Sequence, residues 1–244
     1  TPEASGIGAL MLEANAGIGW RDAQNILAYS ARHVGSAVGG PTQYAERDAW
    51  SFNGAGNWNG GGLHFSNDYG NGLLDAHAAV RLAETWLVGR TAQTSANEIS
   101  VRGSIPNGRH ALADGGASEY RFTLGSGVDV EHMVLDLDGL QHGDAGQLTI
   151  ELTSPSGTVS QLLRNNASGS AISVGWELMS NEFRGEESAG TWTVRIADSA
   201  AGTRGTFTGA SLTAFGGRHT ADDLHVYTDE FGVYGNGTRA TLRD

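Results

Sequence analysis

The chain has 244 residues and a net charge of −12, from 15 basic and 27 acidic residues. This acidity argues against binding of nucleic acid or of an anionic membrane surface, because both require a basic protein surface. There is no cysteine and every basic residue is arginine, which excludes disulfides, thiolate metal sites, lysine Schiff bases and Walker phosphate loops. With 37 glycines, about twice the usual share, the composition favours turn-rich β structure.

Helical periodicity marks the first 88 residues. The pattern predicts a helix over 2–15 whose apolar residues recur at intervals of three and four. Gly6 and Gly8 lie inside it, where each glycine costs about 1 kcal/mol relative to alanine. We therefore expect another backbone to pack closely on this helix and to bury it; the alternative is a weakly helical chain end.

Two further helices are expected over 20–33 and 75–86. Asp22 lies in the first turn of the former, with Arg32 and His33 in its last turn, and Asp75 is placed to cap the latter. Residues 35–74 between them are rich in glycine and asparagine, including Asn59-Gly60, and this composition is typical of turns.

The composition changes after residue 88. Residues 89–96 are small and polar and are interpreted as a linker. Residues 97–217 contain short runs in which apolar and polar residues alternate, at 119–124, 134–140, 148–152, 191–196 and 206–215, which predicts an all-β sandwich. Residues 218–244 are expected to form an acidic, solvated tail.

A search for local catalytic motifs yields no active site. No two histidines have zinc-ligand spacing, and no serine is flanked by glycines in the nucleophile-elbow pattern. His64, Ser66 and Asp68 are close in sequence, but a triad normally gathers distant residues, so a surface loop is the favoured interpretation.

Three carboxylates are the candidate metal ligands. Asp136 and Asp138 share one face of a predicted strand, and Asp144 follows in a loop. Calcium prefers such oxygen donors, so a calcium site is one hypothesis, and a solvated strand face is the other. The acidic pairs Asp222-Asp223 and Asp229-Glu230 are interpreted as solvated, again with calcium as the alternative.

Residues 1–15, with Trp20-Arg21-Asp22 and 24–27 after them, resemble subtilisin-family serine proteases of the kexin/furin branch. In that family the nucleophile lies in a Gly-Thr-Ser-x-x-x-Pro motif, whose last two positions match Thr1 and Pro2, and Gly6 continues the match. The resemblance implies that this chain contains no catalytic residue. The nucleophilic serine would lie upstream with two residues between it and Thr1, and the aspartate, histidine and oxyanion-hole asparagine would lie further upstream. Residues 66–86 resemble the last turn and helix of the same catalytic domain.

The alternating region is similar to the P domain, also called the Homo B domain, that follows this catalytic domain. Its signature positions here are Ser154, Pro155, Gly157, Thr158, Trp176, Gly190, Trp192 and Asp198. One departure is Gly146-Gln147-Leu148, where the family usually has Gly-Asp-Leu. Residues 222–244 are similar to segments that precede serralysin-type calcium repeats in bacterial proteases.

The resemblance implies a mixed fold: the C-terminal helical part of an α/β subtilisin-like domain over 1–88, then a jelly-roll β-sandwich over 97–217, then the start of a further region over 218–244. We expect the C-terminal part of a secreted bacterial serine endopeptidase that acts on polypeptides. Its P domain would pack on and stabilise the upstream catalytic domain. Membrane and nucleic acid are not expected partners, no cofactor beyond calcium is implied, and the chain alone should be inactive.

The alternative function is a non-catalytic β-sandwich module for binding or structure. Trp58, Trp176 or Trp192 could then stack on sugars if they were exposed.

Overall fold

The computed structural model describes residues 2–166, 169–220 and 224–234, and these divide into two compact units. The first unit holds the described residues up to Glu98 and from Thr220 onward, and the second holds Ile99–His219. Each has its own hydrophobic core. Within the described residues, no helix is long and apolar enough to cross a membrane.

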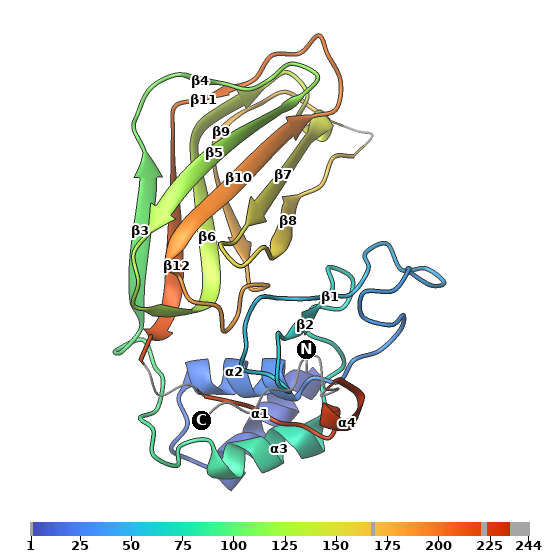
Figure 1. Ribbon diagram of the computed structural model, residues 1–244, viewed down its shortest axis with the longest axis vertical. Coiled ribbons are helices and arrows are strands. Elements are labelled where there is room, and N and C mark those ends of the chain that lie inside the picture. The colour runs from blue at the N-terminus through green and yellow to red at the C-terminus, as the bar shows by residue number, and fades with distance from the viewer. Residues whose placement is uncertain (1, 167–168, 221–223, 235–244) are drawn as a thin grey trace. The chain divides into compact units, whose positions relative to one another are not determined.

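In its described residues, the first unit combines four helices with long loops (Figure 1). Its elements are α1 (Pro2–Ala14), α2 (Trp20–Ser30), α3 (Ala76–Thr85), the single turn α4 (Phe231–Tyr234), and a short antiparallel pair of β1 (Ser51–Phe52) and β2 (His64–Phe65). The prediction for the third helix is confirmed, because Oδ1 of Asp75 accepts the backbone N–H of Ala78 at 2.9 Å and caps the helix.

Helix α2 ends earlier than predicted. Ala31 is extended (φ −65°, ψ 137°), and Arg32 forms an antiparallel bridge with Leu73 through two backbone hydrogen bonds of 2.8 and 2.9 Å. Arg32 and His33 therefore lie outside the helix, and the prediction that they occupy its last turn is wrong. The pairing with a segment 41 residues further along the chain competes successfully with one more helical turn.

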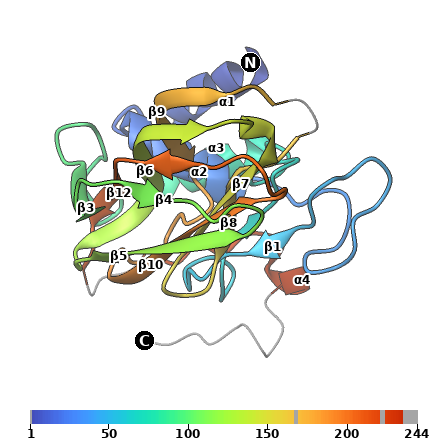
Figure 2. The same ribbon diagram turned by 90° about the horizontal axis from the view of Figure 1, so that it is seen from above.

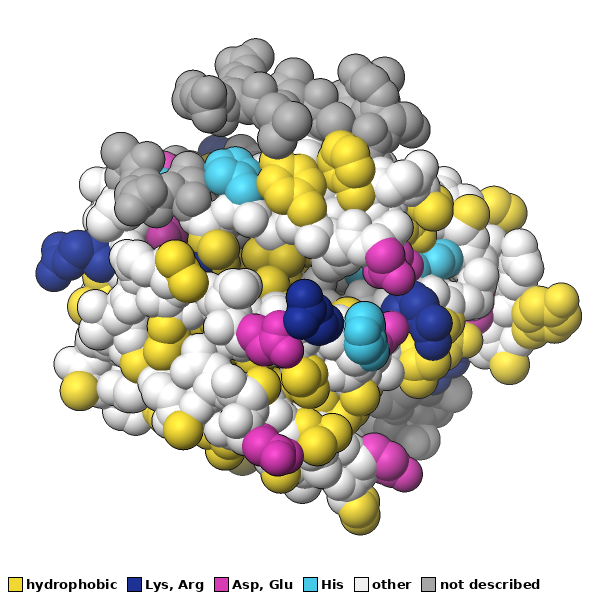
Figure 3. All heavy atoms as spheres, turned by 90° about the horizontal axis from the view of Figure 1, so that it is seen from below, with side chains coloured by type: hydrophobic (Ala, Val, Ile, Leu, Met, Phe, Trp, Pro, Cys, Tyr) yellow, Lys and Arg dark blue, Asp and Glu magenta, His cyan; other side chains and the backbone are white. Residues whose placement is uncertain are grey.

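The prediction that α1 is buried is also wrong for this chain. Met11 is fully buried in the core, but Leu10 and Leu12 are 47% and 49% exposed. A Cβ added at Gly6 or Gly8 would meet no atom within 4 Å, so the expected close backbone neighbour is absent among the described residues. In Figure 3 hydrophobic side chains reach the surface, interspersed with acidic ones.

Part of the expected linker packs on α2. The backbone N–H of Gln93 donates to Asp22, the amide of Asn25 donates to Oε1 of Gln93, and the guanidinium of Arg21 donates to the carbonyl of Thr94. Arg21 and Asp22 are buried. Because Arg21 and Asp22 are buried, their charged groups need hydrogen-bonding partners, and Gln93 and Thr94 supply them. These hydrogen bonds hold this part of the expected linker against α2.

The expectation of a solvated acidic tail over 218–244 is wrong for part of residues 224–234, although Asp229 is exposed as expected. Val226 is 2% exposed and belongs to the core of the first unit, with Leu224 and Tyr234 packed against it. The apolar residues lie on both sides of the adjacent pair Asp229-Glu230, and burial of Val226 holds the segment in the core. Asp222, Asp223 and residues 235–244 lie outside the described residues.

The second unit is a β-sandwich, as predicted (Figure 2). One sheet has the order β5 (Ala117–Leu124), β10 (Gly190–Asp198), β7 (Leu148–Thr153) and β8 (Val159–Leu163). The other has the order β3 (Ile99–Ile105), β12 (Gly209–Arg218), β6 (Val128–His142), β11 (Thr206–Phe207) and β4 (His110–Ala111), with β9 (Ile172–Ser180) also paired to β6. A 3-10 turn over Ala145–Gln147 precedes β7.

Period-two alternation explains the core of this sandwich. Leu148, Ile150 and Leu152 on β7 are fully buried, and each is flanked by partly exposed residues. Trp192, Val194 and Ile196 on β10 follow the same pattern, and Val194 and Ile196 are registered against Leu152 and Ile150. The two sheets therefore bury one face of each strand against the other.

Candidate functional site

The most connected group of signature residues is the turn between β7 and β8. Ser154 and Thr158 close it, because the backbone N–H of Ser154 donates to the carbonyl of Thr158 at 2.9 Å. Gly157 donates its N–H to the carbonyl of Ser154 at 3.0 Å. The hydroxyls of Ser154 and Ser156 lie 2.8 Å apart.

Glu186 gathers the hydroxyls of this turn. Its two carboxylate oxygens accept hydrogen bonds from the hydroxyls of Ser156 and Thr158, and the side chain is buried (4% exposed). Glu186 is held by backbone bonds to β6, where the N–H of Val130 donates to its carbonyl at 2.8 Å. Nothing in the sequence near Glu186 indicates its contact with residues 28 and 30 positions earlier.

This arrangement is a structural clamp. A catalytic serine needs a base that takes its proton, whereas Ser156 and Thr158 donate to a carboxylate that is already surrounded by donors. Hydrogen bonds from both hydroxyls to the charged carboxylate offset part of the cost of burying it. The turn therefore joins β7 and β8 to the segment before β10.

Gly190 and Pro155 lie against each other beside this turn. Gly190 has a φ of +126°, and a Cβ at that position would stand 2.8 Å from both Cβ and Cγ of Pro155. Only glycine fits this position, for its backbone conformation and for its close approach to the proline ring.

Trp192 anchors the centre of the same unit. It is fully buried, its indole N–H donates to the carbonyl of Ser188 at 2.9 Å, and its ring meets that of Phe183 edge-on at 4.9 Å. Trp58 in the first unit is fully buried too, while Trp176 is partly buried against the sandwich core. The burial of Trp58 and Trp192 leaves neither ring open for stacking on a sugar.

Asp198, the last signature position, pairs with a buried histidine. Its Oδ2 lies 3.2 Å from Nε2 of His142, and both side chains are almost inaccessible to solvent. Nδ1 of His142 in turn contacts the backbone of Asp144. The pair ties the end of β6 to the end of β10.

The three candidate metal ligands lie in different local settings. Asp136 accepts a hydrogen bond from the hydroxyl of Ser211 at 3.1 Å, Asp138 is exposed on β6, and Asp144 caps the 3-10 turn through the N–H of Gly146 at 2.9 Å. Within the described part of the chain, no three histidine or acidic side chains form a group that could hold a metal ion. Calcium binding stays a prediction, and these carboxylates give it no common site.

The interpretation of His64 and Ser66 as surface-loop residues is wrong. His64 is fully buried on β2, with its ring 4.7 Å from that of Trp58, and Ser66 is 1% exposed. The hydroxyl of Ser66 donates to the carbonyl of Asp48, and the carboxylate of Asp68 accepts two backbone N–H groups from residues 47 and 48. These polar groups hold the loop together.

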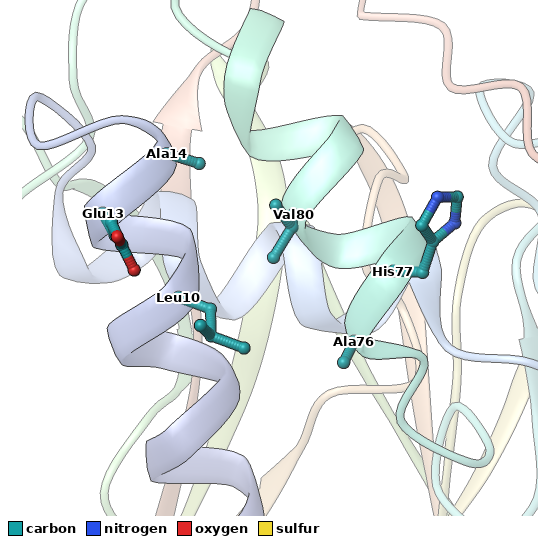
Figure 4. A pocket seen from close by; sticks show the side chains of 6 residues that line it. All are labelled: Leu10, Glu13, Ala14, Ala76, His77 and Val80. Carbon is teal, nitrogen blue, oxygen red and sulfur yellow. The ribbon is translucent and has the colours of Figure 1, made fainter.

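The protease-motif residues lie on α1, of which Pro2 and Gly6 are described and Thr1 is not. An apolar groove of about 450 Å³ lies between the C-terminal half of α1 and the first half of α3 (Figure 4). It is lined by Leu10, Glu13, Ala14, Ala76, His77 and Val80. Among the described residues, Glu13 and His77 are the titratable groups that line it, and the other four lining side chains are apolar, so the groove suits apolar packing.

Comparison with known proteins gives matches to one class of protease. Residues 130–214 match the family model of the proprotein convertase P-domain. Furin-like protease 2 of Drosophila melanogaster is 32% identical over 210 residues, which cover 80% of this chain and 11% of that protein. Neuroendocrine convertase 2 of Bos taurus is 31% identical over 204 residues, which cover 80% of this chain and 29% of that protein.

A solved structure agrees with these relatives. The serine protease of Aeromonas sobria superposes with a TM-score of 0.66 at 25% identity, over 88% of this chain and 43% of that chain. This chain covers less than a third of the length of the Drosophila and Bos taurus proteases. Because the second unit is only half of this chain, matches over 80% and more extend into the first unit. The resemblance to the kexin/furin branch and its P domain is confirmed, and the similarity proposed for residues 222–244 stays a prediction.

Proposed function

From the premise that residues 130–214 are a proprotein convertase P-domain, we propose that this chain is the C-terminal part of a kexin-like serine endopeptidase. The observation that carries the proposal is the extent of the similarity, which covers the P-domain and continues into the helical unit before it. The first unit would then be the end of the catalytic domain. The endopeptidase would be secreted and would cleave polypeptides.

The catalytic groups are proposed to lie before Thr1. A serine separated from Thr1 by two residues would attack the scissile carbonyl, a histidine would take its proton, and an aspartate would orient the histidine. Helix α1 would follow the nucleophile directly. Exposed Leu10 and Leu12, the open space at Gly6 and the groove beside α3 support this placement, since each offers an apolar or close-packing surface to further chain.

The P-domain is proposed to stabilise the catalytic domain. The contacts of its signature residues support this, because Gly190, Trp192 and Asp198 hold the sandwich together, as does Glu186 through Thr158. A rigid sandwich gives a firm packing surface to a partner domain.

The test is to express the 244-residue chain beside a longer one that includes the upstream coding sequence. With fluorogenic peptides ending in paired basic residues, we expect hydrolysis by the longer protein only, and its loss when the proposed serine is changed to alanine. Activity of the 244-residue chain that survives repurification would refute the proposal. So would an upstream reading frame without a Gly-Thr-Ser motif before Thr1.

A further inference from the structure

Residues 224–234, which follow the sandwich in sequence, return to the first unit (Figure 1). Val226 forms a parallel bridge with Trp58. The N–H of Val226 donates to the carbonyl of Asn57 at 2.8 Å, and the N–H of Asn59 donates to the carbonyl of Val226 at 2.9 Å. The segment is thus added to the Asn57–Asn59 backbone as a short β-strand, the pattern by which many proteins capture an extended peptide.

The tight turn at Asn59-Gly60 shapes the receiving edge. Trp58 and Gly61 exchange backbone hydrogen bonds of 2.9 Å, and the two residues between them have φ values of +46° and +76°. These are the conformations of a type I′ turn, for which Asn-Gly is the preferred sequence. The turn leaves the Asn57–Asn59 edge free to pair.

The side chain of Asn59 recognises Thr228 specifically. Asn59 is fully buried; its Nδ2 donates to the hydroxyl of Thr228 at 2.9 Å, and its Oδ1 accepts the N–H of Thr228 at 2.8 Å. A buried amide satisfied on both sides by one residue is a strong constraint on register, because loss of that residue would leave two polar groups without those bonds.

Apolar and charged contacts flank this pairing. Val226 packs in the core around Trp58, and the ring of Tyr234 lies 5.7 Å from that of Trp58 and 5.6 Å from that of Phe52. Oε1 of Glu230 accepts the backbone N–H of His33 at 3.1 Å. The contacts span the described segment from Leu224 to Tyr234.

We propose that the Asn57–Asn59 edge is a peptide-binding site and that residues 224–234 of the same chain are its occupant. The site takes an extended peptide in parallel pairing, with an apolar residue at the position of Val226 and threonine two residues later. Its occupation ties the chain that leaves the sandwich back to the first unit, so the sandwich is connected at both ends to one unit. This inference goes beyond the proposed protease function and does not depend on it.

The test compares Val226→Asp with Val233→Asp in the full chain. The two variants make the same chemical change in one segment, but Val226 is 2% exposed and Val233 is 67% exposed. We expect Val226→Asp to accelerate hydrogen exchange at the backbone amides of positions 226 and 228 at least tenfold. Val233→Asp should leave exchange at both amides unchanged. The amides of α2 report whether the first unit stays folded.

A second variant covers the case in which Val226→Asp unfolds the unit. Asn59→Gly keeps a residue that tolerates the positive φ and removes both side-chain bonds to Thr228. We expect faster exchange at Thr228, with the α2 amides unchanged. A separate test adds a labelled peptide of residues 224–234 to the Val226→Asp chain, whose own segment is released. The unmodified peptide should bind this chain, whereas a peptide with aspartate at position 226 should not.

Several outcomes would overturn the proposal. Amides of Val226 and Thr228 that exchange at unprotected rates in the unaltered chain would show that the segment is not bound. Equal effects of the two aspartate variants, or an Asn59→Gly chain that exchanges like the unaltered one, would show that the contacts do not hold it. Failure of the unmodified peptide to bind a folded Val226→Asp chain would show that the edge is not a binding site.

Discussion

Asp22 joins the start of α2 to the end of α3 by accepting the indole N–H of Trp86 at 2.8 Å, across 64 residues of sequence. Its second oxygen accepts the N–H groups of Gly19 and Gln93, both at 2.8 Å. One buried carboxylate therefore caps a helix, fixes a tryptophan and holds the segment that leads to the sandwich. This explains why an acidic residue is buried in the first turn of α2.

Replacement of Asp22 by alanine should destabilise the first unit. Three donors lose their acceptor, and we expect a loss of about 3 kcal/mol, since each unsatisfied buried donor costs about 1–3 kcal/mol and the losses overlap. Asp22→Asn should lose less because it keeps one acceptor oxygen. Amide exchange in α2 and α3 measures the effect, with exposed Glu13→Ala as the control. Equal exchange in Asp22→Ala and Glu13→Ala would contradict the prediction.

In the second unit, Glu186→Ala should destabilise the sandwich by about 2 kcal/mol, because the hydroxyls of Ser156 and Thr158 lose a buried acceptor. Glu186→Gln should have a smaller effect, since it retains one carbonyl oxygen. The midpoint of thermal unfolding of the sandwich is the measurement. Glu177→Ala, a change at an exposed acidic residue on β9, should leave the midpoint unchanged. If it lowers the midpoint as much as Glu186→Ala does, the clamp is not the cause.

The parts of the structure that could be predicted from sequence are those with local causes. Alternation on β7 and β10 and the Asp75 cap follow from neighbouring residues, so those elements were predicted closely. The contact of Glu186 with Thr158 joins segments 28 residues apart, and no periodic pattern signals it. The contact of Thr228 with Asn59 spans 169 residues, and the acidic character of its segment favoured a solvated tail.

The error at α1 has a different cause. Glycine within an apolar helix correctly indicates a surface suited to close packing, but a pattern cannot say whether the packing partner belongs to the same stretch of sequence. In the described residues the space beside Gly6 is open. The same reasoning succeeds at Gly190, where the close neighbour Pro155 is present.

Gly190→Ala should therefore be more damaging than alanine at another glycine with similar backbone conformation. Gly127 has a φ of +117° and open space around an added Cβ, so Gly127→Ala reports backbone strain alone. We expect Gly190→Ala to cost about 1–3 kcal/mol more, because its Cβ must displace the Pro155 ring. Denaturant unfolding of both variants measures the difference.

A double-mutant cycle isolates the contact with the proline. Pro155→Gly removes both ring atoms that meet the new Cβ, so Gly190→Ala should be less costly in that background. An additive double variant would mean that strain at Gly190, and not the clash with Pro155, accounts for the loss.

Docking of residues 224–234 should weaken as the pH rises from acidic toward neutral. Burial raises the pKa of Glu230, with Asp229 and Asp75 adding to the effect, and the His33 N–H and Arg32 opposing it. The carboxyl of Glu230 in the docked segment therefore keeps its proton at pH values where the released segment has lost it. As a result, the stability of the docked state falls as the pH rises from the ordinary glutamate pKa of 4.5 through the higher pKa of docked Glu230. Below that interval both states are protonated and no penalty arises. Glu230→Gln keeps an acceptor for the His33 N–H and should flatten this dependence, while Glu13→Gln should not. The measurement is the protection factor of the Thr228 amide between about pH 4 and pH 7, a range that begins near the ordinary glutamate pKa and extends above it. Protection that increases with pH in the unaltered chain would contradict the assignment to Glu230.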